Sequence, residues 1–258
     1  ENGVCDALLS SEALDSNQSV EERESASIPK QTTDDVQLFN ALLHATSSGY
    51  ESIAIALLDV DAVPNFGEPS CRLSRISHRA EQRHIFRSSP LHLASLQALP
   101  RLVQKLLEKN AKYNSPNASG MFPIHLAAAG ESSRAMNEDE ESRRLECAQL
   151  LLDAGTPLTI QDGSKQTILH AAARAGNVAV LDLALAKWNG VNLELRDSWS
   201  RTPLHWAVLN GQAEALKVLL DNGSNPEPFR PKPQQKRTSA AAESPLEICR
   251  RIHGGTTQ

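Results

Sequence analysis

Aromatic side chains are scarce in this sequence. They make up 4% of its 258 residues, whereas hydrophobic residues as a whole make up 40%. A chain with few aromatic residues and many Leu and Ala suits thin, stacked helices better than a β-sandwich. The composition therefore favours an all-α fold.

Cysteine is sparse as well. Cys5, Cys71, Cys147 and Cys249 lie far apart and form no C-x-x-C pair. The sequence therefore offers neither a zinc framework nor the cysteine density of a small secreted domain. We expect reduced thiols, and hence a cytoplasmic or nuclear location.

Long apolar runs are missing too. None approaches the roughly 18 residues of a membrane helix, and no signal peptide is visible. We therefore expect no transmembrane segment. The chain begins with Glu1 rather than Met, which leaves open that it is a fragment of a longer protein.

The sequence also lacks the motifs of common enzyme active sites. It contains no G-x-S-x-G, no P-loop, no G-x-G-x-x-G and no H-E-x-x-H. Ser and His are plentiful, but no spacing pairs a nucleophile with a base. We predict a protein that is not an enzyme, with no catalytic residues and no cofactor.

Negative charge is concentrated at one end of the chain. Residues 1–35 carry nine acidic side chains against Arg23 and Lys30, a net charge of −7, so the rest carries +2 of the total of −5. Residues 1–31 are rich in Ser, Glu, Asp and Gln, and they cannot bury enough apolar surface to offset the entropy of ordering. We predict a disordered acidic tail over 1–31.

A four-residue pattern recurs along the remaining chain. Ser89–His92, Phe122–His125, Thr167–His170 and Thr202–His205 share it, and Ser244–Glu247 is a weaker copy. The last residues of successive copies are 33, 45, 35 and 42 residues apart. A unit of about 33 residues with loop insertions explains these separations.

The copy that begins at Thr202 predicts its own helix boundaries. Thr202 can cap a helix through its hydroxyl, and Pro203 suits the first helical position because it has no N–H to leave unpaired. Gly211 ends this helix. A second helix over 212–222 ends at Gly223, a residue that readily adopts the left-handed conformation. The repeated unit is therefore a helix–turn–helix.

These copies resemble the ankyrin-repeat family, whose first helix opens with Thr-Pro-Leu-His-x-Ala. The resemblance implies an all-α ankyrin-repeat solenoid of stacked helix–turn–helix units, joined by short β-hairpin loops and carrying long loop insertions. About six units, some degenerate, cover Asp35 to the C-terminus. The expected segments of the domain at 32–258 are repeat 1 at 32–66, a basic insertion at 67–87, repeat 2 at 88–118, repeat 3 at 119–163 with an acidic insertion, repeat 4 at 164–198, repeat 5 at 199–229, a basic linker at 230–243 and a C-terminal capping helix at 244–258.

The recurring His residues invite interpretation as a metal site. Successive copies should lie about one repeat apart, so they cannot easily converge on an ion that needs three or four ligands. The resemblance implies instead that each His bonds the capping residue and a neighbouring backbone carbonyl, although Phe122 offers His125 no hydroxyl. No metal is expected, and the predicted cap network comprises Ser89, His92, His125, Thr167, His170, Thr202, His205, Ser244 and Glu247.

The resemblance further implies that the hairpin tips and the first helices line a concave groove that binds another protein. Trp199 stands out, because an exposed Trp flanked by Arg has the composition of an interface hot spot. It could equally pack over Trp206, which we expect in the core. Carried over position by position, the partner-binding candidates are Trp199, Arg196, Arg201, Tyr113, Asp162, Lys165, Arg174, Asn210 and Gln97.

The predicted function is that of a non-enzymatic adaptor or scaffold that binds a protein partner, as a monomer or as a subunit of a hetero-complex. A second interpretation is a regulatory ankyrin segment of a larger enzyme, channel or ubiquitin-ligase component. A third is binding of nucleic acid or acidic lipid through the basic segments 72–87 and 230–237, which a strong dependence on salt would reveal.

Overall fold

The computed structural model describes residues 33–65, 88–130, 137–187, 190, 192–227 and 243–254. The predicted acidic tail, the basic insertion and the basic linker up to residue 242 lie outside the described residues. By its contacts the chain divides into Glu1–Gln37 and Leu38–Gln258. The second unit holds everything considered below, apart from the start of the first helix.

The described residues contain eleven helices and no strand, which confirms the predicted all-α class. The helices are α2 (Thr33–Ser47), α3 (Glu51–Asp59), α4 (Pro90–Leu96), α5 (Pro100–Glu108), α6 (Pro123–Ala129), α7 (Glu138–Asp153), α8 (Ile168–Ala175), α9 (Val178–Lys187), α10 (Pro203–Leu209), α11 (Ala213–Asp221) and α12 (Pro245–Gly254). Four of the helices that open a repeat, α4, α6, α10 and α12, begin at a proline, because its fixed φ and missing N–H suit the first helical position.

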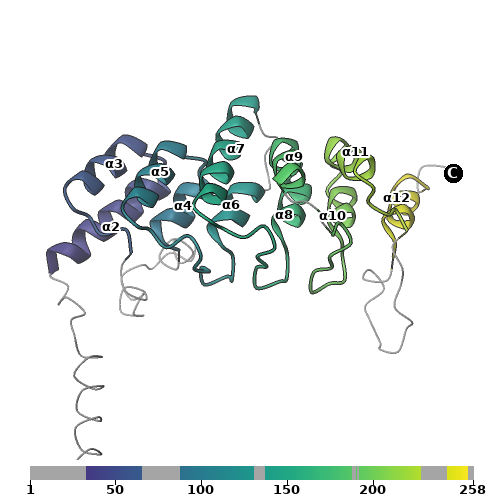
Figure 1. Cartoon of the computed structure of the whole chain (residues 1–258), viewed down its shortest axis with the longest axis horizontal. Coiled ribbons are helices and arrows are strands. Elements are labelled where there is room, and N and C mark those ends of the chain that lie inside the picture. Colours follow the sequence, from purple (N-terminus) through teal and green to yellow (C-terminus); the bar gives the residue numbers. More distant parts are fainter. Residues whose placement is uncertain are drawn as a thin grey trace, which may run out of the picture. The chain divides into compact units, whose positions relative to one another are not determined.

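The helices of Leu38–Gln258 form two layers (Figure 1). In the first-helix layer, α4, α6, α8, α10 and α12 each pack against the next. In the second-helix layer, α3, α5, α7, α9 and α11 do the same. The layers also pack on each other within a repeat, as α8 does on α9 and α10 on α11. Each helix pair is therefore covered by its neighbours in sequence, which is the packing of a repeat solenoid.

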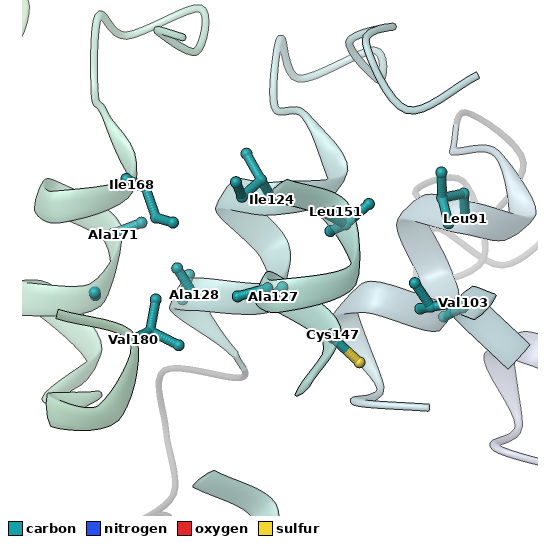
Figure 2. Packing of buried hydrophobic residues seen from close by; sticks show 14 of the residues in the cluster. Leu91, Val103, Ile124, Ala127, Ala128, Cys147, Leu151, Ile168, Ala171 and Val180 are labelled. Atoms are coloured by element: carbon teal, nitrogen blue, oxygen red, sulfur yellow. The ribbon is translucent and has the colours of Figure 1, made fainter. Parts of the chain in front are cut away.

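The apolar core lies between the two layers. The helix α6 is buried along its whole length, from Pro123 to Ala129. Its small Ala side chains let the neighbouring helices approach closely while the interior stays filled. Figure 2 shows Ala127 and Ala128 of α6 in the same cluster as Leu151 of α7 and Val180 of α9. The recurring Ala after the four-residue pattern is therefore a packing requirement.

The acidic insertion expected in repeat 3 is partly helical. The acidic run 138–141 forms the first turn of α7, which begins at Glu138, and not a loop. Carboxylates are stabilised there by the partial positive charge of a helix N-terminus. Arg144, on the same helix, is 2% exposed and bonds to Glu140 at 2.8 Å and to the carbonyl of Leu96 at 3.1 Å. This side chain fastens α7 to the end of α4.

Candidate functional site

Three tight turns that connect the repeats share one hydrogen-bond pattern. We call them the fingers: Asn117–Met121, Asp162–Gln166 and Asp197–Arg201. In each, a side-chain oxygen of the first residue accepts the backbone N–H groups of the third and fifth residues at 2.8–3.0 Å. The first residue also donates its N–H to the carbonyl of the fifth. The predicted hairpin loops are thus turns built around an Asn or Asp, with no strand assigned in the described residues.

The fingers are tied to one another as well as closed on themselves. Gly163 donates its N–H to the carbonyl of Gly120 at 3.0 Å, and Ser198 donates to the carbonyl of Ser164 at 2.9 Å. Backbone bonds of this kind hold each finger against the one before it. Side chains on the fingers are therefore presented from a fixed row of turns.

Trp199 lies on the third finger and remains 46% exposed. Its ring meets the ring of Trp206 on α10 edge to face, with centroids 6.0 Å apart and an interplanar angle of 81°. Aromatic pairs prefer this arrangement because the positive edge of one ring meets the negative face of the other. Trp199 therefore does what both sequence interpretations proposed, since it packs on Trp206 and still faces solvent.

Trp206 is half-buried and lies outside the hydrophobic core clusters, so its predicted core position is wrong. The polar end of the indole explains this: Nε1 donates to the Oδ2 oxygen of Asp197 at 2.8 Å. An indole N–H needs an acceptor when it leaves water. The third finger supplies that acceptor at the edge of the core, so the Trp206 ring lies at this edge and not in the core.

Two guanidinium groups flank the Trp206 ring. The Cζ atom of Arg201, on the third finger, lies 4.9 Å from the ring centroid, and that of Arg174, on α8, lies 5.8 Å away. Both distances are within the range of an attraction between a cation and an aromatic face. Two tryptophans and two arginines from α8, α10 and the third finger therefore form one cluster, which we call the Trp–Arg cluster.

Asp197 connects the residues of this cluster by hydrogen bonds. It is 5% exposed, and besides Trp206 it accepts the N–H groups of Trp199 and Arg201 at 2.9 Å. The side-chain amide of Gln166, on the preceding finger, lies within 3.4 Å of its Oδ2 oxygen. The carboxylate thereby fixes the third finger to α10 and to its neighbour.

The His residues of the cap network bond to the starts of the first helices and to neighbouring backbone carbonyls. His170 accepts the backbone N–H of Thr167 at Nδ1, 3.2 Å away, and its Nε2 lies 3.1 Å from the carbonyl of Leu195. His205 has the same pattern, with Thr202 at 3.0 Å and the carbonyl of Glu243 at 3.2 Å. A backbone N–H can only donate, so we assign the proton of both neutral rings to Nε2.

Burial sets the protonation of these rings. It lowers the pKa of His92 and of His205 to about 4, and it also lowers the pKa of His125 and His170. The rings lie in a water-poor interior that disfavours the charged form. All four imidazoles are therefore neutral near pH 7.

The remaining members of the predicted cap network fall into three cases. The Ser89 hydroxyl lies 2.7 Å from Nδ1 of His92. Ser244 and Glu247 form a reciprocal box, with bonds of 2.9 and 3.2 Å. His125 keeps its bond to the carbonyl of Gln166 at 3.0 Å, but its buried Nδ1 has no partner in the described part of the chain. Phe122 stands where the other repeats place a hydroxyl, so the third cap is incomplete.

Not all predicted partner-binding residues lie with the Trp–Arg cluster. Tyr113 is half-buried and packs against the core, and Asp162 is engaged in closing the second finger. Lys165 is exposed at the tip of that finger. Asn210 is exposed and bonds to the carbonyl of Trp206 at 2.9 Å, whereas Gln97 lies within 3.4 Å of the carbonyl of Ser47.

Arg196 completes the predicted set. Its guanidinium donates to the carbonyl of Ser200 at 3.1 Å, so it braces the third finger from the side. With Arg174, Arg201 and Trp199, it belongs to the part of the prediction that the structure brings together.

The comparison with known families agrees with this geometry. The sequence profile described as "Ankyrin repeats (3 copies)" matches residues 135–229, which include the second and third fingers and the Trp–Arg cluster. Residues 135–229 are ankyrin repeats. The resemblance drawn from the four-residue pattern and the predicted ankyrin solenoid are thus confirmed.

Curated relatives match about half of this chain. An E3 ubiquitin-protein ligase KEG of Arabidopsis thaliana is 29% identical over 53% of this chain and 8% of its own length. A B-cell lymphoma 3 protein homolog of Mus musculus is 30% identical over 58% of this chain and 31% of its own. The transient receptor potential cation channel subfamily A member 1 of Homo sapiens is 31% identical over 52% and 11%. The chain thus spans less than a third of the length of these relatives.

The described residues contain no group of three or more His, Cys, Asp or Glu side chains that could hold a metal ion. Nor is any helix among them both long and apolar enough to cross a membrane. Burial raises the pKa of the Cys147 thiol to about 12, so this fully buried side chain is a neutral part of the core.

The sequence reasoning missed the role of Asp197, although a signal for it was present. In three repeats an Asn or Asp lies at the same distance before the His that ends the four-residue pattern. These pairs are Asn117 and His125, Asp162 and His170, and Asp197 and His205. Each of these residues closes a finger. The ankyrin repeats thus carry a second periodic position besides the pattern itself.

Proposed function

We propose that this chain is a protein-interaction segment without catalytic activity, which binds a partner protein through its fingers and first helices. The observation that carries the proposal is the state of Trp199. It is 46% exposed, yet it is held by Trp206 and by a finger with a buried carboxylate at its base. An aromatic anchor that is already fixed loses little entropy on binding, and Trp and Arg are enriched among residues that dominate interface energies.

The test is proximity labelling in cells with the wild-type chain and two variants. The first variant combines Trp199→Ala with Arg201→Ala. The matched control is Leu220→Ala, because Leu220 is another exposed apolar residue, at 41%, but lies on α11 in the second-helix layer. We expect the double variant to lose neighbours that the control keeps. A double variant that keeps every neighbour would place the binding surface elsewhere.

A second candidate is a regulatory ankyrin segment of a larger protein. The small share of each relative that the chain spans, from 8% to 31% for the three above, favours it. These relatives include a ubiquitin ligase and a channel subunit. The full-length open reading frame tests it, because a catalytic or membrane domain beyond this chain would make the whole protein an enzyme or a channel.

The remaining parts of the sequence prediction stay proposals. These are a monomer or a subunit of a hetero-complex, a cytoplasmic or nuclear location, and the weaker alternative of nucleic acid or acidic lipid at the basic segments 72–87 and 230–237. Both segments lie outside the described residues, so the proposal for them rests on sequence alone.

A further inference from the structure

We propose that the Trp–Arg cluster recognises an acidic peptide segment of the partner, in which a carboxylate accepts hydrogen bonds from Arg174 and Arg201 while an adjacent apolar side chain contacts Trp199. This inference rests on the proposed function and names the chemistry of the partner.

The first observation is that two buried donors in the cluster have no acceptor. The Nε atoms of Arg174 and Arg201 are buried, yet neither has a hydrogen-bond partner within the described parts of the chain. Leaving such a donor unsatisfied is costly, so a native structure usually provides an acceptor. At Arg144 the corresponding Nε is paired, because it donates to Glu140 at 3.1 Å, although the buried Nη1 of Arg144 has no partner in the described residues.

The second observation is that neither arginine is paired with a carboxylate of the described residues. Asp197 accepts Trp206 and two backbone N–H groups of the third finger. Asp162 closes the second finger in the same way. Glu194 accepts the N–H of Asn225 at 2.8 Å through Oε1, and its buried Oε2 has no hydrogen-bond partner in the described residues. Because neither Arg174 nor Arg201 forms an ion pair there, their guanidinium groups are available to a carboxylate of another molecule.

The arrangement of the two guanidinium groups favours a ligand with negative charge. A cation would normally be attracted to the face of an exposed indole, but two guanidiniums already flank the Trp206 ring. A cationic ligand would be repelled by them. An anion would gain charge-assisted hydrogen bonds, which are the stronger kind.

The composition of the cluster favours peptide over nucleic acid. A nucleic-acid backbone is bound by many cations spread along a groove. Here the free donors are confined to two side chains, and the acidic residues Asp197 and Glu194 lie close to Arg201 along the chain. Beside them Trp199 offers an apolar edge that suits an apolar side chain. One acidic residue next to an apolar one meets all three groups.

The experiment selects a displayed library of random twelve-residue peptides on the full chain. The same selection is repeated on Trp199→Ala, on Arg174→Gln with Arg201→Gln, and on Arg143→Gln. Arg143 is the matched control, since it is an exposed arginine of α7 that bonds to the carbonyl of Asp139. Far-UV circular dichroism and the melting temperature verify that each variant is folded.

We expect enriched peptides to carry Asp or Glu beside an apolar residue. Changing that acid to its amide should weaken binding by about tenfold or more, the range of charge-assisted hydrogen bonds. The double Arg→Gln variant should bind acid and amide peptides equally, while Arg143→Gln keeps the preference.

Each other outcome overturns the inference in a distinguishable way. Enriched peptides that need Trp199 but carry no acid would leave the proposed function intact and refute the acidic partner. A library with no peptide dependent on Trp199 would contradict both. If a single-stranded oligonucleotide binds more tightly than the enriched peptides, and the double Arg→Gln variant loses this binding, the site would be assigned to nucleic acid. Self-association in sedimentation that the same variant removes would assign it to a second copy of the chain.

Discussion

Trp206 donates its indole N–H to Asp197 across 2.8 Å, and this bond joins the third finger to α10. The same carboxylate accepts two backbone N–H groups of its own finger and lies within reach of the Gln166 amide on the finger before it. One buried side chain thus fixes the position of Trp199 and the orientation of Trp206. The exposed surface of the cluster depends on this internal polar residue.

Replacing Asp197 with Ala removes all of these bonds. We expect the free energy of unfolding to fall by about 3–5 kcal/mol, since hydrogen bonds to a charged group contribute roughly 1.5–3 kcal/mol each and are not additive. Asp162→Ala is the matched control, because it loses the finger bonds but no indole, and should cost about 1–2 kcal/mol. Urea unfolding at pH 7 measures both. Equal losses would show that the bond to Trp206 contributes nothing.

The left-handed residue of the first finger should tolerate no side chain. A Cβ at Gly120 would lie 2.7 Å from the Cα of Gly163, whereas one at Gly211 would meet nothing within 4 Å. Both residues have positive φ, +76° and +68°, so Gly211→Ala measures the cost of the conformation alone, about 1–2 kcal/mol. Gly120→Ala should cost a further 1–3 kcal/mol, roughly that of overpacking. Thermal unfolding of the two variants compares them, and equal melting temperatures would refute the close contact between fingers.

The buried imidazoles should make the fold sensitive to mild acid. Burial holds the pKa of His205 and His92 near 4 in the folded chain, below the ordinary value of 6.5. As the pH falls from 6.5 to 4, the unfolded chain therefore binds protons that the folded chain does not, and the free energy of unfolding decreases over that window. Well above pH 6.5 these groups confer no pH dependence, because they are neutral in both states.

This dependence can be measured by urea unfolding at intervals between pH 4.5 and 7.5. The slope of the unfolding free energy against pH reports how many protons the chain takes up on unfolding. At pH 5.5 His205→Gln should lower that number by about one. A slope that is the same in wild type and His205→Gln would mean that His205 titrates normally in the folded chain.

Two neighbouring arginines of α7 should differ sharply in their effect on stability. Arg144 is buried and bonds to Glu140 and to the end of α4, while Arg143 is exposed. Arg144→Ala should cost about 2–4 kcal/mol, below the full range for a buried pair because Glu140 is partly exposed. Arg143→Ala should change stability by less than about 0.5 kcal/mol. Chemical unfolding distinguishes them, and a neutral Arg144→Ala would refute its role between the helices.

The sequence predicts the local features of this fold, but not those that depend on contacts between repeats. The pattern at Thr202–His205 predicts a helix start because the cap and the proline act locally. The acidic run 138–141 was misplaced because a charge run suits both a solvated loop and a helix N-terminus. The place of Trp206 depends on Asp197, which lies in the preceding finger, and spacing alone does not reveal such a contact. The bonds of Arg144 cross from α7 to α4 and depend on how the repeats stack.

The most direct test of a protein-binding surface at Trp199 is the affinity of the purified chain for the neighbour most strongly labelled in cells, measured by calorimetry with Trp199→Ala and Leu220→Ala. Trp199→Ala should weaken binding by about tenfold or more, as expected of a hot-spot residue, while Leu220→Ala stays within about twofold of wild type. The reverse result, with affinity lost at Leu220 and kept at Trp199, would contradict the account.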